Sequence, residues 1–212
     1  MRYDLAVLSD LVIDVLLPVE HLPIESGKHQ WTPGPTDELG GGCNFLVAAR
    51  RVNLNVVALG GVGHDAYGDS MIRLLDEEGV DTSQIRRFPT RITDYCYVIS
   101  DDKGGHMYLL VERERPEWGI QPGWLETIRQ ARGALLDGYI FRGLIHPPEI
   151  LAAMDMAREN HIPIFFDPGP SALSIPVETL KEAIRRATVL LLTADEAAPL
   201  TTETGPAAIA VA

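Results

Sequence analysis

Residues 39–44 read LGGGCN, and residues 60–68 read GGVGHDAYG. Between them lie a helical pattern as far as Arg51 and a short apolar run that ends at Gly60. Three consecutive glycines let the backbone approach a ligand without interference from Cβ atoms, and they leave amides at a helix N-terminus. Asn44 adds a donor and an acceptor for a hydroxyl group. A flexible turn with an ordinary helix cap would use the same glycines. The glycines alone therefore do not distinguish a ligand-binding turn from a structural one.

Outside these stretches, short apolar runs alternate with amphipathic helical patterns. Continuous apolar runs, which are typical of strands buried on both faces, occupy residues 3–8, 56–60, 133–140, 162–166 and 188–192. Helical spacing follows or separates these runs, as in residues 68–78, which end at Gly79. The alternation predicts an α/β fold with a central, mostly parallel sheet flanked by helices.

Two segments interrupt this alternation. Residues 19–39 are rich in proline and glycine, and residues 87–112 hold apolar side chains around a turn at residues 101–105, which predicts a β-hairpin. We expect both segments to form a small antiparallel β lid over the edge of the larger sheet. The predicted division is therefore an α/β core of residues 1–18, 40–86 and 113–212 with a β lid of residues 19–39 and 87–112.

Composition narrows the classes of partner. The 212 residues carry 18 Lys and Arg against 30 Asp and Glu, a net charge of −12 that disfavours binding to nucleic acid. Two cysteines without C-x-x-C spacing predict neither a disulfide framework nor a zinc site. Asp4, Asp10 and Asp14 interrupt the apolar N-terminus, which suits neither a signal peptide nor a membrane span. We expect a soluble, cytoplasmic protein with no membrane or nucleic-acid partner.

A dinucleotide site is the main alternative for the second glycine cluster. Residues 61–66 match G-x-G-x-x-G/A after a strand and at the start of a helix. A dinucleotide-binding unit also needs a second parallel strand that ends in an acid about 20 residues further on. After Gly79 the chain leads instead into the predicted hairpin, so dehydrogenase chemistry is disfavoured. Cys43 could be a reactive thiol at a helix N-terminus, but its small size favours a packing role.

Taken together, the motifs resemble a known family. The order G-G-G-C-N, a glycine pair, V-G-x-D-x-x-G and a helix ending in E-E-G-V-D-T resembles the N-terminal signature of the ribokinase-like (PfkB-type) carbohydrate kinases. Residues 9–14 are similar to the first strand of that family and the aspartate after it. Residues 165–170 resemble its D-P-N-x-R strand end, and residues 193–196 fall where it carries N-x-x-E. The resemblance covers residues 3 to about 200.

The resemblance implies an ATP-dependent sugar kinase that uses Mg²⁺. It assigns sugar binding to Asp14, Gly41, Gly42 and Asn44, and the phosphate and magnesium side to Asp167, Thr193 and Glu196. Glu196 is expected to organise magnesium-bound water, a role that suits a hard oxygen ligand. Thr193 stands where asparagine is usual, and the glycine turn lacks the lysine of ribokinase itself, which makes ribose a less favoured substrate.

One expected segment does not occur in the sequence. The family carries G-A-G-D, whose aspartate accepts the hydroxyl proton, and no such segment follows Glu196, so the catalytic base is unassigned. We expect the C-terminal part to be missing and the 212 residues alone to be inactive. Two alternatives stay open: a nucleoside kinase whose base stacks on Tyr95, Tyr97 or Tyr108, and a non-catalytic sugar-binding fragment. A homodimer through lid residues 92–111 is also expected.

Overall fold

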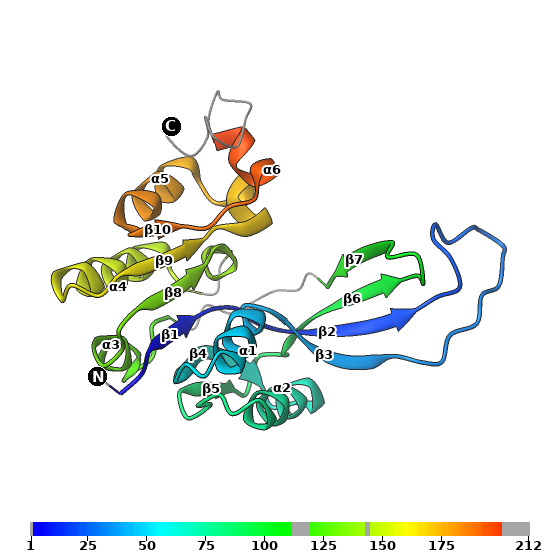
Figure 1. Cartoon of the computed structure of the whole chain (residues 1–212), viewed down its shortest axis with the longest axis horizontal. Coiled ribbons are helices and arrows are strands. Elements are labelled where there is room, and N and C mark those ends of the chain that lie inside the picture. The colour runs from blue at the N-terminus through cyan, green and yellow to red at the C-terminus, as the bar shows by residue number, and fades with distance from the viewer. Residues whose placement is uncertain (1, 112–118, 143–144, 201–212) are drawn as a thin grey trace.

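The computed structural model describes residues 2–111, 119–142 and 145–200, and its strands form two sheets (Figure 1). Lid residue 112, core residues 113–118 and 143–144, and residues 201–212 with the terminal apolar run lie outside this description. The larger sheet has the order β10-β9-β8-β1-β4-β5, and all its neighbouring pairs are parallel. Its strands are β1 Leu5–Leu8, β4 Val56–Gly63, β5 Ile85–Phe88, β8 Ala134–Asp137, β9 Ile164–Asp167 and β10 Val189–Leu190.

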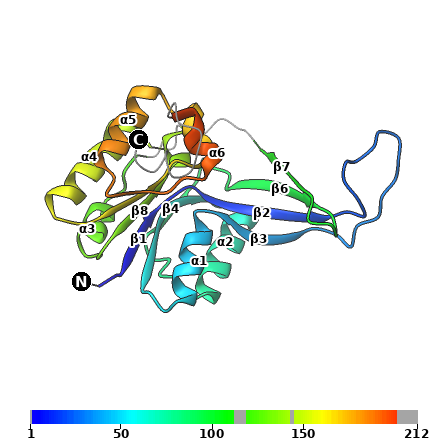
Figure 2. The ribbon, with the colours of Figure 1, turned by 45° about the horizontal axis from the view of Figure 1, so that its top comes forward.

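Helices cover both faces of this sheet, as Figure 2 shows. One face carries α1 Cys43–Arg51 and α2 Ala66–Glu77, and the other carries α3 Trp124–Arg129, α4 Pro147–Glu159 and α5 Val177–Arg186. A separate apolar core lies on each side. The first core contains Leu46 and Met71, and the second contains Trp124, Met154 and Leu180. The predicted α/β architecture is therefore confirmed.

Three short segments complete the ends of these elements. The brief helix α6 Ala194–Ala197 follows β10, and 3-10 turns occupy Gly138–Phe141, Gly169–Ser174 and Ala198–Leu200. The first of these turns ends β8 at Asp137, three residues earlier than predicted, because the Asp137 side chain accepts the N–H groups of Tyr139 and Ile140. That capping turns the chain out of the sheet.

Strand β5 is a difference from the sequence prediction. It pairs in parallel with β4, so Arg87 and Phe88 belong to the larger sheet and not to the lid. The strand ends in Phe88 and therefore lacks the acid that a dinucleotide site requires.

The smaller sheet has the order β3-β2-β6-β7 and extends to one side of the larger one (Figure 1). It is mixed rather than purely antiparallel, because β2 and β6 run parallel while the two outer pairs are antiparallel. Its strands are β2 Leu11–Pro18, β3 Thr36–Gly41, β6 Asp94–Ser100 and β7 His106–Leu110.

Strand β2 lies in the smaller sheet, whereas the sequence prediction gave residues 1–18 to the core. The reason is that β1 ends at Leu8 and passes into β2 through Ser9 and Asp10 alone, so no loop marks the change of sheet. The remaining limits of core and lid stay a prediction.

The segment Gly63 to Gly68 anchors the chain where it enters the smaller sheet. Asp65 caps α2 by accepting from the Gly68 N–H at 2.8 Å, and its second oxygen accepts from the Thr93 N–H at 2.8 Å. The Thr93 hydroxyl in turn accepts from the Gly63 N–H at 2.8 Å. The second glycine cluster thus binds a neighbouring loop of the same chain.

Within the described ranges, no helix is long and apolar enough to cross a membrane.

We predict that Asp65→Ala lowers the free energy of unfolding by about 1–3 kcal/mol, because it removes a helix cap and leaves the Thr93 N–H without its acceptor. Urea denaturation followed by circular dichroism measures the loss.

Asp69→Ala is the matched control in the same helix. Asp69 is exposed and forms a surface ion pair with Arg87, so its removal is expected to cost less than about 1 kcal/mol. Equal losses for the two variants would contradict the anchoring role of Asp65.

Candidate active site

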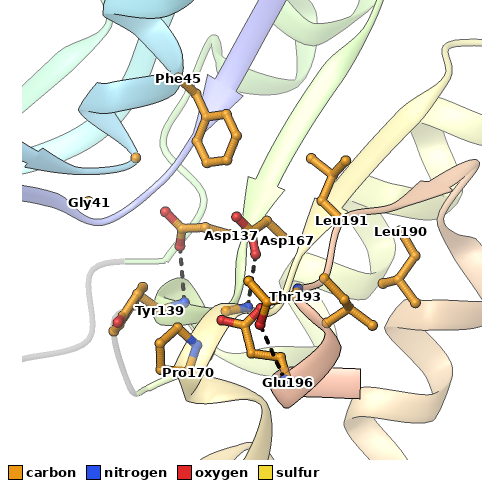
Figure 3. Close-up of a pocket in the computed structure, with 13 residues that line it drawn as sticks. Gly41, Phe45, Asp137, Tyr139, Asp167, Pro170, Leu190, Leu191, Thr193 and Glu196 are labelled. Carbon is orange, nitrogen blue, oxygen red and sulfur yellow. Dashed lines mark hydrogen bonds between the residues drawn. The ribbon is translucent and has the colours of Figure 1, made fainter. Parts of the chain in front are cut away.

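Two adjoining cavities lie beside the carboxyl ends of β1, β8 and β9. The edge cavity, about 560 Å³, is shown in Figure 3, and the lid cavity, about 430 Å³, lies under the smaller sheet. The edge cavity is lined by Gly41, Gly42, Phe45, Asp137, Tyr139, Asp167, Gly169, Pro170, Leu190, Leu191, Leu192, Thr193 and Glu196. The lid cavity is lined by Asp10, Val12, Asp14, Gly41, Asn44, Asp94, Tyr95, Cys96, Tyr108, Leu110, Val111, Tyr139 and Pro170.

The two cavities share Gly41, Tyr139 and Pro170, so they form adjoining compartments of one site. This site lies where the strand order reverses, because β1 has β4 on one side and β8 on the other. Ligands of open α/β sheets bind outside the carboxyl ends of the strands at such a switch point. The topology alone therefore marks this place as the candidate site.

Three of the predicted sugar residues, Asp14, Gly41 and Asn44, come together in the lid cavity. Burial raises the pKa of the Asp14 carboxyl above its ordinary value. A Cβ atom at Gly40 would overlap that carboxylate, so glycine there leaves room for it. The cavity thus offers a desolvated acceptor beside an amide that can donate and accept.

Gly42 belongs to the edge cavity, with the predicted phosphate-side residues Asp167, Thr193 and Glu196. A Cβ atom at Gly42 would overlap the Ser9 hydroxyl, which explains why glycine is needed at this position. Helix α1 begins directly after Gly42 and has no side-chain cap. Its first N–H groups are therefore suited to an anionic ligand.

The carboxylates of the edge cavity suit a cation held through water. Glu196 forms a capping box with Thr193, its Oε2 accepting from the Thr193 N–H at 2.8 Å. Burial, and then the nearby charge of Glu196, raise the pKa of Asp167. In the part of the chain that is described, no group of three or more His, Cys, Asp or Glu is arranged to hold a metal directly. Two carboxylates in one cavity suit hydrated Mg²⁺, which binds through one or two carboxylates and keeps several of its waters.

The sequence analysis missed Asp137, a buried acid in the edge cavity. Its carboxylate accepts the Ser9 hydroxyl and the N–H groups of Tyr139 at 3.0 Å and Ile140 at 3.3 Å. Burial raises the pKa of Asp137 to about 7. A signal was present, because Asp137 lies in register with Asp167 and likewise ends a buried strand (Figure 3).

The lid cavity also holds residues that no motif marked. Asp10 and Asp94 line it, and the buried Arg91 behind them forms ion pairs with both. Arg91 stands in the segment predicted to form the β lid, where an arginine is ordinarily solvated. Only the fold shows that it is buried.

Aromatic side chains close the lid cavity. Tyr95 and Tyr108 line it, whereas Tyr97 packs edge-on against Tyr95 with ring centroids 5.4 Å apart and is not among the lining residues. Cys43 is fully buried with its Sγ 3.4 Å from Met71 Sδ, and burial raises the pKa of its thiol. A packing role for Cys43 agrees with this environment.

Comparisons with known proteins agree with the architecture. The profile of the pfkB family carbohydrate kinases matches residues 3–212. The deoxyribokinase of Salmonella typhi is 26% identical over 110 residues, which cover 51% of this chain and only 36% of that protein.

Two solved structures share the fold. The Arabidopsis thaliana ribokinase, complexed with ribose and ATP, has a TM-score of 0.78 at 21% identity. The match covers 100% of this chain and 67% of the ribokinase chain. The Methanocaldococcus jannaschii nucleoside kinase has a TM-score of 0.70 at 16% identity, with 98% of this chain and 67% of that chain covered.

We predict that Asp137→Asn gains stability relative to the wild type as pH rises from 5 to 8. Because the folded-state pKa of Asp137 is raised to about 7, the folded chain keeps a proton that the unfolded chain releases near pH 4. The contribution of Asp137 to wild-type stability therefore falls as pH rises from about 4 to 7 and is level above that. Asparagine does not titrate, so urea denaturation at both pH values should show a relative gain of about 2 kcal/mol.

Asp101→Asn is the control. Desolvation raises the pKa of Asp101, but N–H groups of Gly105 and Leu22 outweigh it and hold that pKa below its ordinary value. Asp101 is therefore ionised throughout this range, and its variant should differ from the wild type equally at both pH values. A pH-independent difference for Asp137→Asn would contradict the buried, protonated state.

Proposed function

The chain belongs to the pfkB family of carbohydrate kinases, and we propose that it binds the acceptor sugar in the lid cavity and the phosphate groups of ATP at the edge cavity. One observation carries this proposal: the two cavities adjoin at Gly41, one lined by hydroxyl-binding groups and the other by an uncapped helix N-terminus. Phosphoryl transfer depends on positioning and on fixed charge, and this pair of cavities can supply both.

Each side of the site has a distinct role in the proposal. The Asp14 carboxylate accepts hydrogen bonds from sugar hydroxyls, and Asn44 fixes their orientation. The N–H groups at the start of α1 face the transferring phosphate. Glu196 and Asp167 would hold magnesium-bound water, and Mg²⁺ would supply neutralisation of the phosphate charge. The proton acceptor is expected in a G-A-G-D segment, which the 212 residues do not contain.

The chain spans 36% of the deoxyribokinase and about two thirds of the ribokinase structure, so the activity of the whole protein is part of the proposal. The proposed compartment is the cytoplasm.

A nucleoside kinase is the second candidate. Tyr95 and Tyr108 line the lid cavity, and Tyr108 is 57% exposed, so a nucleoside base could stack there. A non-catalytic sugar-binding fragment is the third.

We predict that Asp14→Asn raises the dissociation constant for the best-bound sugar at least about tenfold, because a neutral amide loses the charge-assisted hydrogen bond. Calorimetry with ribose, fructose and adenosine, and an assay for ADP release with ATP and Mg²⁺, measure binding and turnover. Adenosine binding without sugar binding would favour the nucleoside kinase. Sugar binding without ADP release would favour the non-catalytic sugar-binding fragment.

Asp37→Asn is the control for that variant. Asp37 of β3 pairs with Val15 of β2, the residue after Asp14. Successive side chains of a strand point to opposite faces of the sheet, so Asp37 lies on the face opposite Asp14, and its substitution should leave sugar affinity unchanged. A wild-type chain that is folded but binds neither sugar nor nucleoside would refute the proposal.

We also propose a homodimer through the smaller sheet. Strand β7 is at the edge of that sheet and exposes Met107, Tyr108, Leu109 and Leu110, an apolar edge of the kind that pairs with a second copy. Sedimentation should give a dimer, and Leu109→Lys should shift it towards monomer, because a lysine on an edge strand opposes pairing. A strict monomer at all concentrations would exclude this interface.

A further inference from the structure

A buried cluster of three charged side chains lies behind the lid cavity. Arg91 Nη2 is 3.2 Å from Asp10 Oδ1 and also pairs with Asp94 Oδ2. The exposed fractions of the side chains are 3% for Arg91, 2% for Asp10 and 10% for Asp94. Both aspartates line the cavity, whereas Arg91 is not among its lining residues. The cation therefore supports the two acids from behind.

Such a cluster is poorly explained by stability alone. Desolvation of buried charges often cancels their attraction, and well-packed apolar residues of similar volume serve stability at least as well. Its position points to a role in the site. Asp10 follows the carboxyl end of β1, and Asp94 is the first residue of β6, opposite Val12 of β2. Arg91 thus joins the end of the larger sheet to the start of the smaller one.

The second glycine cluster fixes the loop that carries Arg91. The loop is bound at Thr93 by the side chain of Asp65 and by the Gly63 N–H. A Cβ atom at Gly63 would overlap the carbonyl oxygen of Arg91, so glycine is needed for this close approach. The backbone from the Arg91 carbonyl to Thr93 is held in place, which limits where Arg91 can direct its N–H groups.

We propose that Arg91 is a positioning residue that holds the carboxylates of Asp10 and Asp94 in a fixed orientation, so that both accept hydroxyl groups of the phosphate acceptor. This inference rests on the proposed function of the lid cavity. A guanidinium has N–H donors enough for two carboxylates, and both of these carboxylates line the cavity. With Asp14, the lid cavity then presents three carboxylates. They favour a neutral substrate rich in hydroxyl groups and disfavour a substrate with an acidic group in this cavity.

The test is selectivity between a sugar and its monodeoxy analogues. Calorimetry is run with ribose, fructose and the monodeoxy form at each ring position, on the wild type, Arg91→Met and Arg91→Lys. The wild type should bind the better parent sugar at least about tenfold more tightly than one or more analogues, because the missing hydroxyl leaves a carboxylate unpaired. Arg91→Met should reduce that ratio below about threefold, and Arg91→Lys should restore part of it.

Two further variants separate positioning from folding. Asp94→Asn keeps the shape of the cluster and the pairing of Arg91 with Asp10, so it tests the same selectivity if Arg91→Met does not fold. Arg186→Met is the matched control, because Arg186 also binds two acids, Asp155 and Glu182, between α4 and α5 and away from both cavities. It should lower Tm and leave the selectivity ratio unchanged.

The outcomes are distinct. A folded Arg91→Met or Asp94→Asn that keeps the wild-type ratio would overturn the inference and leave the proposed function standing. Uniformly weaker binding of all sugars would also overturn it, because a structural role predicts that pattern. A folded wild type that binds no sugar would refute the proposed function itself, and the inference with it.

Discussion

The site depends on the two-residue junction between β1 and β2. Ser9 and Asp10 are both buried, and they join the centre of the larger sheet to the smaller sheet with no loop between them. The Ser9 hydroxyl donates to Asp137 at the end of β8, and Asp10 pairs with Arg91 before β6. Because Ser9 bonds to the larger sheet and Asp10 bonds to the loop before the smaller sheet, the edge cavity and the lid cavity are held in fixed relation to each other.

Several acidic side chains lie around this junction, where burial disfavours their ionised form. Burial raises the pKa of Asp14, Asp137 and Asp167, and in the lid cavity only Asp10 and Asp94 are given a buried arginine as partner among the described residues. A core built for stability alone would use apolar side chains here. Perturbed acids concentrated at a switch point are instead typical of a site that binds and orients a ligand.

The sequence predicted the parts of this arrangement that have a period or a motif. The buried parallel strands, the helices between them and the hairpin of β6 and β7 follow from hydrophobic spacing and turn chemistry. The departure of β2 from the larger sheet could not be predicted, because only Ser9 and Asp10 separate it from β1 and no turn sequence marks the change of sheet. Strand β5, with two arginines in Ile85–Phe88, was missed because its pattern is that of a polar loop. Arg91 was missed for a similar reason, since its burial follows from partners distant in sequence.

The two glycine clusters illustrate why a motif needs its structural context. Gly42 and Gly63 both lack a Cβ because something must approach closely, but the approaching groups differ. At Gly42 it is the Ser9 hydroxyl beside Asp137, so that glycine shapes the wall of a cavity. At Gly63 it is the carbonyl of Arg91, so that glycine fixes a loop of the protein itself. The second cluster matches a dinucleotide pattern and its strand-to-helix context but lacks the acid at the end of the next strand, and it contributes to the site through the loop that it holds.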